Sequence, residues 1–327
     1  MGEERGGAPG KRDTRQKAAR QRKGTAEAVR GYGTEQDAPT RYQMMATSLK
    51  IAVLTIGLLM SKCSGQTGSE PQRPLLGHDV ELFRNTPAWE LAQAVAAEDS
   101  ARIALLCNED TTLVDFQEPR FGLTLLEWAI NRSQYPSAKA LCEVGADPNV
   151  QSFDGSSAMI HAADNNETSD YLRLLIQYGG DVNAMATPRP GITEGALQLK
   201  TPLIAAAGSR LESVKVLVDR GADINYRDKE FGSALMSACL LERIDVVHYL
   251  VIDMDVEYDG VLSTTLAGDT LYLSHYLREM TFKLSSEAHR LKMEVVDYLE
   301  KHGMSYRNTP IPERYLKKYP KEYLEAY

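Results

Sequence analysis

Side chains that could support catalysis are few and scattered. No histidine belongs to an HExxH helix, and no GxSxG, P-loop or GxGxxG segment follows a strand-and-helix pattern. No CxxC pair or histidine–cysteine cluster has the spacing of zinc ligands. The sequence therefore predicts no enzyme activity, no metal ion, no cofactor and no small-molecule substrate. The six histidines are expected to be packing or surface residues: His78, His161, His248, His275, His289 and His302.

One cysteine differs from the others. Cys63 follows the ten-residue apolar run at 51–60, which is too short to span a membrane and has the length of a signal-peptide core. A short apolar run ending close to cysteine resembles the bacterial lipoprotein class, whose cysteine is acylated, although Lys62 stands where that class has Gly, Ala or Ser. The three remaining cysteines are predicted to be small buried hydrophobes in helices: Cys107, Cys142 and Cys239.

The segments before residue 87 set the expected location. Residues 1–43 carry 10 Lys and Arg against 6 Asp and Glu with few large apolar residues, which predicts a basic disordered extension. It could contact nucleic acid or acidic lipid, be merely solvated, or lie upstream of the true start. Residues 44–63 resemble a signal peptide, and 64–86 form a flexible linker. We expect a protein of the bacterial cell envelope, lipid-anchored at Cys63 or periplasmic, and a cytoplasmic one if translation starts at Met1.

The helices that would position any site repeat along the chain. VGADPN at 144–149, YGGDVN at 178–183 and RGADIN at 220–225 end three successive segments of similar hydrophobic pattern. Recurrence about every 20–50 residues is typical of stacked repeats, and longer steps between repeats are accommodated as loop insertions. Aligning the final asparagine gives steps of 34, 34, 42, 32 and 50 residues between these positions: Asp115, Asn149, Asn183, Asn225, Glu257 and Arg307.

Each unit contains the signals of two helices and a turn. Thr201 can cap a first helix, and Pro202 occupies its first turn, where a missing N–H costs nothing. Gly221 stands where the second helix would end in a left-handed turn.

These residues resemble the ankyrin-repeat family. The segments that carry the resemblance are KTPLIAA at 200–206, GLTLLEWA at 122–129, GSSAMIHA at 155–162 and GSALMSA at 232–238. The resemblance implies an all-α solenoid of about six helix-turn-helix repeats with hairpin fingers over 87–307, its end repeats serving as caps. The signature histidine is replaced in this chain, so the buried histidine network of consensus repeats is not expected: Glu127, Ile160, Ile204 and Met236 stand in its place.

The same resemblance implies a partner-binding surface formed by the hairpin tips and the first helices. Phe121, Phe153 and Phe231 recur before the hairpin glycine, either as contact residues or as packing between fingers. The insertion at 185–199 is expected to be a binding finger, with disorder as the alternative. The predicted partner-binding residues are Arg120, Phe121, Phe153, Asp154, Arg189, Glu194, Arg227, Asp228, Glu230 and Phe231.

Residues 308–327 have a pattern of their own. Four tyrosines recur every four residues, which places them along one helix face, although Pro320 must break or restart that helix. They are expected to cap the last repeat, with a partner-binding stripe as the alternative: Tyr315, Tyr319, Tyr323 and Tyr327.

Charge narrows the class of partner. Residues 44–327 carry 27 Lys and Arg against 39 Asp and Glu, so this part repels nucleic acid and attracts a protein with a basic surface. The sequence favours a non-catalytic protein-binding module of the envelope. An immunity-like neutraliser of a toxin or effector, a tethered envelope scaffold and a cytoplasmic regulator remain open.

Overall fold

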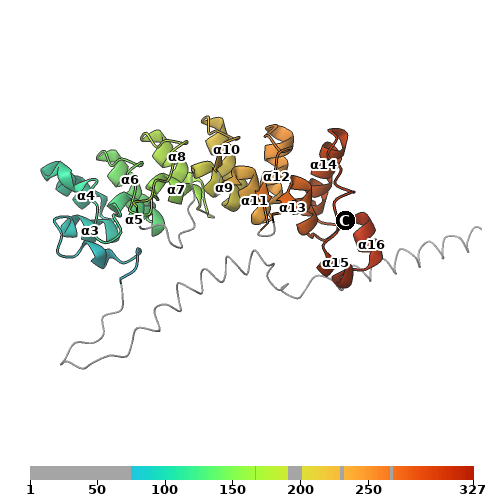
Figure 1. The fold of residues 1–327 in the computed structure, drawn as a ribbon. Coiled ribbons are helices and arrows are strands. Elements are labelled where there is room, and N and C mark those ends of the chain that lie inside the picture. Colours follow the sequence, from blue (N-terminus) through green and yellow to red (C-terminus); the bar gives the residue numbers. More distant parts are fainter. Residues whose placement is uncertain (1–74, 166, 191–200, 229–231, 266–267) are drawn as a thin grey trace, which may run out of the picture.

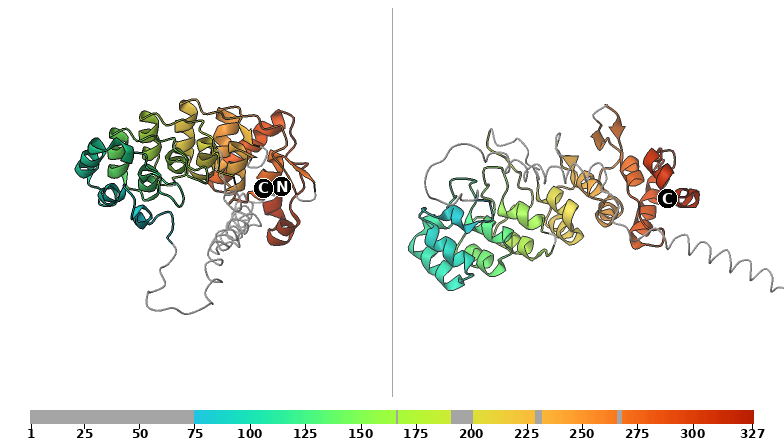
Figure 2. Two further views of the ribbon diagram at one scale, coloured as in Figure 1. Left: turned by 60° about the vertical axis from the view of Figure 1, so that its left-hand side comes forward. Right: turned by 90° about the horizontal axis from the view of Figure 1, so that it is seen from below.

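Paired helices stand side by side in a single elongated row (Figures 1 and 2). The computed structural model describes residues 75–165, 167–190, 201–228, 232–265 and 268–327. Six helix pairs follow the 3-10 turn η1 (Val80–Phe83), which confirms the expected all-α solenoid. The pairs are α3 (Trp89–Ala96) and α4 (Ser100–Glu109), α5 (Leu125–Asn131) and α6 (Tyr135–Glu143), α7 (Ala158–Ala163) and α8 (Asp170–Gln177), α9 (Pro202–Ser209) and α10 (Leu211–Asp219), α11 (Ala234–Leu240) and α12 (Ile244–His248), and α13 (Leu273–Glu279) and α14 (Glu287–Lys301).

Four of the first helices begin at a hydroxyl cap. The side-chain oxygens of Thr124, Ser157, Thr201 and Ser233 each accept a hydrogen bond from the backbone N–H three residues ahead, at 3.2–3.4 Å. This bond satisfies one of the donors that a helix start leaves unpaired. The caps fix where each first helix begins, and their apolar residues then pack on the neighbouring first helices in one continuous core.

The recurring Asp-x-Asn turn joins each repeat to the next. Asp181 Oδ1 accepts from the backbone N–H of Asn183, and Asn183 Nδ2 donates to the carbonyl oxygen of Gly221 at 3.1 Å. Asn183 Oδ1 in turn accepts from the backbone N–H of Asp223 at 2.9 Å. Asn149 makes the same pair of bonds one repeat earlier, and Asp115 accepts from Asp147 at 3.0 Å.

The sequence-based alignment was wrong by two residues at one repeat. The backbone N–H of Glu257 donates to Asn225 Oδ1 at 2.9 Å, as that of Asp223 donates to Asn183. Glu257 therefore occupies the aspartate position of the turn, and Asp259 the asparagine position. The corrected step from Asn225 to Asp259 is 34 residues, equal to the two steps that end at Asn149 and Asn183, and the π-helical turn η3 (Tyr249–Asp253) lies in the second helix of this repeat.

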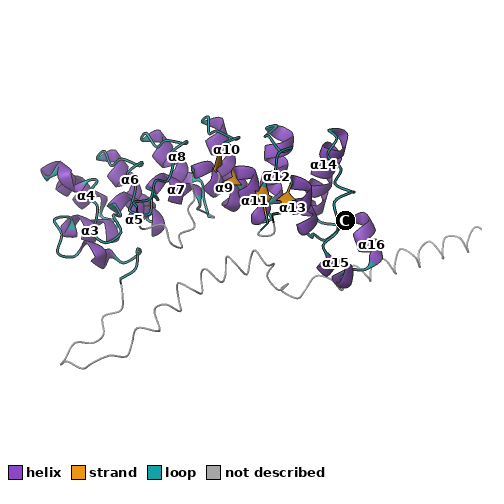
Figure 3. Ribbon diagram, in the orientation of Figure 1, coloured by secondary structure: helices purple, strands orange, loops and turns teal. Residues whose placement is uncertain are grey.

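Short strands form the fingers between the helix pairs (Figure 3). β1 (Arg227–Asp228) pairs antiparallel with β2 (Gly232–Ser233), and β3 (Ser263–Thr264) pairs antiparallel with β4 (Thr270–Leu271). An isolated bridge joins Gln151 and Ser157. The fingers are therefore hairpins, as expected.

Two short helices, α15 (Glu313–Lys318) and α16 (Lys321–Ala326), lie at the end of the row, separated at Pro320. The Tyr315 hydroxyl donates to the carbonyl oxygen of Glu279 at 2.8 Å, and that of Tyr323 donates to Phe282 at the same distance. Tyr327 is 4% exposed. These contacts with the last repeat favour the capping interpretation of the tyrosine pattern over a partner-binding stripe.

No helix within the described residues is long and apolar enough to cross a membrane. The apolar run at 51–60 and Cys63 lie outside the described residues. The other three cysteines are buried, as expected, and burial raises the pKa of the Cys107 thiol to about 11.

Candidate functional site

Three neighbouring fingers are joined through their backbones. We call residues 117–123 finger 2, residues 151–156 finger 3 and residues 185–190 finger 4. The backbone N–H of Phe153 donates to the carbonyl oxygen of Phe121 at 2.7 Å, and that of Arg189 donates to the carbonyl of Phe153 at 2.9 Å. Each finger is thereby held against the next.

Two glutamines strengthen this stack. Gln117 Nε2 donates to the carbonyl oxygens of Gly122 at 2.7 Å and Gln151 at 2.8 Å. Gln151 Nε2 donates to the carbonyl oxygen of Met185 at 2.6 Å, and its Oε1 accepts from the backbone N–H of Thr187 at 3.0 Å. This ladder was not predicted from the sequence, where its only signal is glutamine at two positions one repeat apart.

A fully buried carboxylate sets the shape of finger 2. Glu118 accepts from the backbone N–H groups of Arg120 at 2.7 Å, Phe121 at 2.6 Å and Leu123 at 3.2 Å. Gly122 then turns the chain with φ +75°, and a Cβ there would lie 2.3 Å from the Phe153 ring. Finger 3 therefore packs directly on the turn of finger 2.

Five of the predicted partner-binding residues come together on these fingers. Arg120, Asp154 and Arg189 are exposed, whereas Phe121 and Phe153 are half-buried. The Arg189 guanidinium lies 3.7 Å from the centroid of the Phe153 ring, and that of Arg120 lies 5.0 Å from the Phe121 ring. The phenylalanines thus pack between the fingers and also support the exposed arginines.

The remaining predicted residues lie elsewhere. Arg227 and Asp228 form strand β1 of the next hairpin, where Arg227 donates to the carbonyl oxygen of Val261. Glu194, Glu230 and Phe231 lie outside the described residues, as does Cys63. The structure therefore assembles one cluster on fingers 2–4 and places Arg227 and Asp228 on a separate finger.

A cavity of about 460 Å³ lies behind the finger cluster. Its lining includes Phe121, Phe153 and Asp154 from the fingers, with Glu127 from α5 and His161 from α7. Glu127 Oε1 lies 3.1 Å from His161 Nε2, and this carboxylate is fully buried. Glu127 stands at the position of the family's signature histidine. It contacts His161, which lies one residue after the corresponding position of the next repeat.

Each member of this pair shifts the other's titration. Burial raises the pKa of Glu127, and the nearby His161 only partly offsets that effect. Burial also disfavours the charged imidazole of His161, but the approach of Glu127 and the charges of Asp154 and Asp164 outweigh it, so the pKa of His161 is raised. Glu127 and His161 therefore form a pair of titratable side chains in the cavity lining, and the charge of each affects the pKa of the other.

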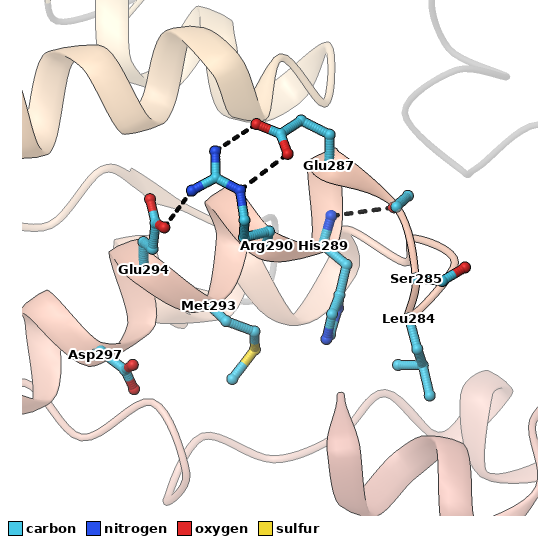
Figure 4. A pocket seen from close by; sticks show the side chains of 9 residues that line it. Leu284, Ser285, Glu287, His289, Arg290, Met293, Glu294 and Asp297 are labelled. Atoms are coloured by element: carbon cyan, nitrogen blue, oxygen red, sulfur yellow. Dashed lines mark hydrogen bonds and ion pairs between the residues drawn. The ribbon is translucent and has the colours of Figure 1, made fainter.

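A second hollow of about 440 Å³ lies on the last repeat (Figure 4). Its most prominent charge, Arg290, pairs with both Glu287 and Glu294 along helix α14. Within the described residues no group of three or more His, Cys, Asp and Glu side chains could hold a metal ion. The charged side chains of this hollow are thus paired along one helix.

Comparison with known proteins agrees with the geometry. The model of the family described as ankyrin repeats (3 copies) matches residues 126–228 and 189–259. Protein PhlB of Serratia liquefaciens is 34% identical over 200 residues, which cover 61% of this chain and 78% of that protein. The chain belongs to the ankyrin-repeat family. Another ankyrin-repeat protein, the B-cell lymphoma 3 protein homolog of Mus musculus, is 31% identical over 146 residues, covering 44% of this chain and 30% of that protein.

Membership in the ankyrin-repeat family gives the coarse function. Ankyrin repeats are protein–protein interaction modules and are generally non-catalytic. The finger cluster of this ankyrin-repeat protein presents a surface of that kind, since charged side chains project from a backbone that is hydrogen-bonded from finger to finger. A protein is therefore the class of ligand that this surface fits.

Proposed function

We propose that the protein binds a protein partner through the finger face, and that it does so in the bacterial cell envelope. The finger face is defined here by Arg120, Phe121, Phe153, Asp154 and Arg189. The observation that supports the proposal most is the backbone stack, in which Phe153 bonds to both neighbouring fingers at 2.7 and 2.9 Å.

The stack favours binding for a thermodynamic reason. Flexible loops lose conformational freedom on association, and a preorganised surface avoids much of that cost. Arginine and aromatic side chains are also those that contribute most at protein interfaces. Arg189 on the Phe153 ring combines both chemistries on one exposed site.

The test is a double charge reversal on the finger face. Arg120→Glu with Arg189→Glu changes two exposed side chains without removing a finger-to-finger hydrogen bond, because those bonds use backbone atoms and the side chains of two glutamines. The matched control is Arg132→Glu with Lys139→Glu, which reverses two exposed charges at the end of α5 and on α6. Thermal unfolding of each variant checks that the fold is retained.

The measurement is affinity capture from envelope extracts of the native host, with each full-length variant as bait. We expect one partner to be retained by wild type and control and lost by the finger-face variant. Equal capture by all three proteins would contradict the proposal. A captured partner that is toxic when expressed alone would identify the protein as a neutraliser.

The envelope location has its own test. Cys63 follows a signal-like apolar run, so Cys63→Ser removes the only cysteine in residues 1–74. If Cys63 carries a lipid, the variant moves from the membrane fraction to the soluble fraction of the host. Unchanged fractionation of wild type and variant would refute lipid anchoring at this residue.

A further inference from the structure

The cavity behind the finger face contains a carboxylate whose charge is not fully compensated. Glu127 is 0% exposed, and neither carboxylate oxygen accepts a hydrogen bond of good geometry within the described residues. His161 Nε2 lies 3.1 Å from Oε1, and the Ser152 side chain is a second polar neighbour that helps to lower the pKa of this carboxyl. A buried carboxylate whose oxygens lack hydrogen bonds of good geometry is costly, so an added donor would be favoured.

The position of Glu127 relates it to the fingers. It lies on the first turn of α5, three residues after the cap Thr124, and it lines the same cavity as the two phenylalanines of the finger face. The His161 side chain lies beside Glu127 and is 32% exposed, so it lies between the buried carboxylate and solvent. A side chain that enters this cavity therefore meets both the aromatic rings and the acid.

The lining chemistry indicates what would enter. Aromatic faces attract cations, and planar guanidinium groups stack on them. The finger rings already receive guanidinium groups of this chain, Arg189 on Phe153 and Arg120 on Phe121. Asp154, exposed at the cavity rim, adds negative charge, and a guanidinium can donate two parallel hydrogen bonds to a carboxylate. A volume of about 460 Å³ is within the range of binding pockets.

We infer that this cavity receives an arginine side chain of the protein partner, with Glu127 as its counter-ion. The guanidinium enters the cavity that Phe121 and Phe153 line and joins or displaces His161 at the carboxylate. Arg120 and Arg189 then act at the rim, where they exclude water and contact the partner surface. This inference rests on the finger face as the partner-binding surface and names the chemistry that the face recognises.

The experiment needs no partner protein. N-acetyl-arginine amide is titrated into the full-length protein at pH 7 and followed by NMR of the His161 imidazole, with N-acetyl-citrulline amide as the uncharged isostere. We expect saturable binding of the arginine amide in the millimolar range and none of the citrulline amide at the same concentrations. Equal responses to both amides, or no response to either, would overturn the inference.

Two variants assign the binding to the carboxylate. Glu127→Gln keeps the shape and removes the charge, and is expected to weaken arginine-amide binding about tenfold, the loss of one charge-assisted contact. The control Glu143→Gln changes an exposed acid of α6 and should leave the affinity unchanged. An unchanged affinity in Glu127→Gln contradicts the assignment.

His161→Gln covers the case in which Glu127→Gln fails to fold. This variant removes the competing imidazole and, followed by NMR of the α5 backbone amides, should bind the amide at least as tightly as wild type. Weaker binding would overturn the inference. Binding of the amide together with undiminished capture by the finger-face variant would refute the finger face as the partner-binding surface and leave an arginine-binding cavity without that partner. Absent amide binding with capture that depends on the finger face would refute only the arginine site.

Discussion

At the scale of single residues, the recurring asparagine is explained by two bonds that a single side chain makes. Asn183 donates to Gly221 and accepts from Asp223, so it links the end of one second helix to the following turn. The side chain of Asn225 acts as an acceptor: its Oδ1 accepts a hydrogen bond from the backbone N–H of Glu257.

This difference predicts unequal effects of one substitution. Asn183→Asp keeps the acceptor but loses the donor to Gly221, and should lower the free energy of unfolding by about 1 kcal/mol. Asn225→Asp, the matched control, keeps the recorded contact and should cost clearly less. Urea denaturation of both variants measures this, and equal losses would contradict the assigned roles.

A second residue-scale feature is the buried lysine of the last repeat. Lys292 is 0% exposed, donates to the carbonyl oxygen of Met280 at 3.0 Å and lies 3.6 Å from the Tyr327 ring. Burial, with the nearby charge of Arg278, lowers its pKa to about 6. Between that pH and its ordinary pKa, the unfolded chain binds more protons at this site than the folded chain.

Stability at this site should therefore rise with pH from about 6 upward, and be lost as pH falls toward 6. Relative to Lys292→Met, the wild-type free energy of unfolding is expected to increase by up to about 1.4 kcal/mol per pH unit between roughly pH 6 and 9. Lys301→Met, an exposed change on the same helix, should show no such slope. A wild-type-minus-Lys292→Met difference that stays constant with pH would show that the folded pKa is not lowered.

At the scale of elements, two glycines with similar backbones separate strain from packing. Gly122 and Gly145 have φ of +75° and +97°, but an added Cβ meets the Phe153 ring only at Gly122 and meets nothing within 4 Å at Gly145. The left-handed conformation alone costs a side-chain residue about 1–2 kcal/mol.

Gly122→Ala should therefore destabilise the protein more than Gly145→Ala and also abolish partner capture, because finger 3 must move. Gly145→Ala should lose about 1–2 kcal/mol of stability and retain capture. Denaturation and capture are measured on both variants. Retained capture by Gly122→Ala would mean that the packing of fingers 2 and 3 is unimportant for binding.

The elements also show which parts of the fold could be predicted from the sequence. The cap at Thr201, the glycine turn at Gly221 and the hairpins follow local rules, and they were predicted. The position of Glu257 was not, because the segment at 255–257 resembles the Asp-x-Asn turn in sequence and only the bond to Asn225 fixes the register. The Glu127–His161 pair and the glutamine ladder join residues 34 apart, so only the stacking of repeats brings them together.

At the scale of the whole molecule, the row of repeats holds one face in a fixed shape. Neighbouring repeats are joined by the asparagine bonds at the ends of the second helices and by the finger stack. The tyrosine-rich helices α15 and α16 cover the last repeat, where Arg278 donates to the carbonyl oxygen of Tyr306 at 3.3 Å. A protein built in this way presents a preorganised surface to a partner.

The central claim is that the partner binds on the finger face, and amide hydrogen exchange tests it most directly. The full-length protein is compared with and without the captured partner. We predict slower exchange in residues 117–123, 151–156 and 185–190, which form fingers 2–4, and unchanged exchange in the second helices α4, α6 and α8. Protection confined to the second helices, with the fingers unaffected, would show that the partner does not bind on the finger face.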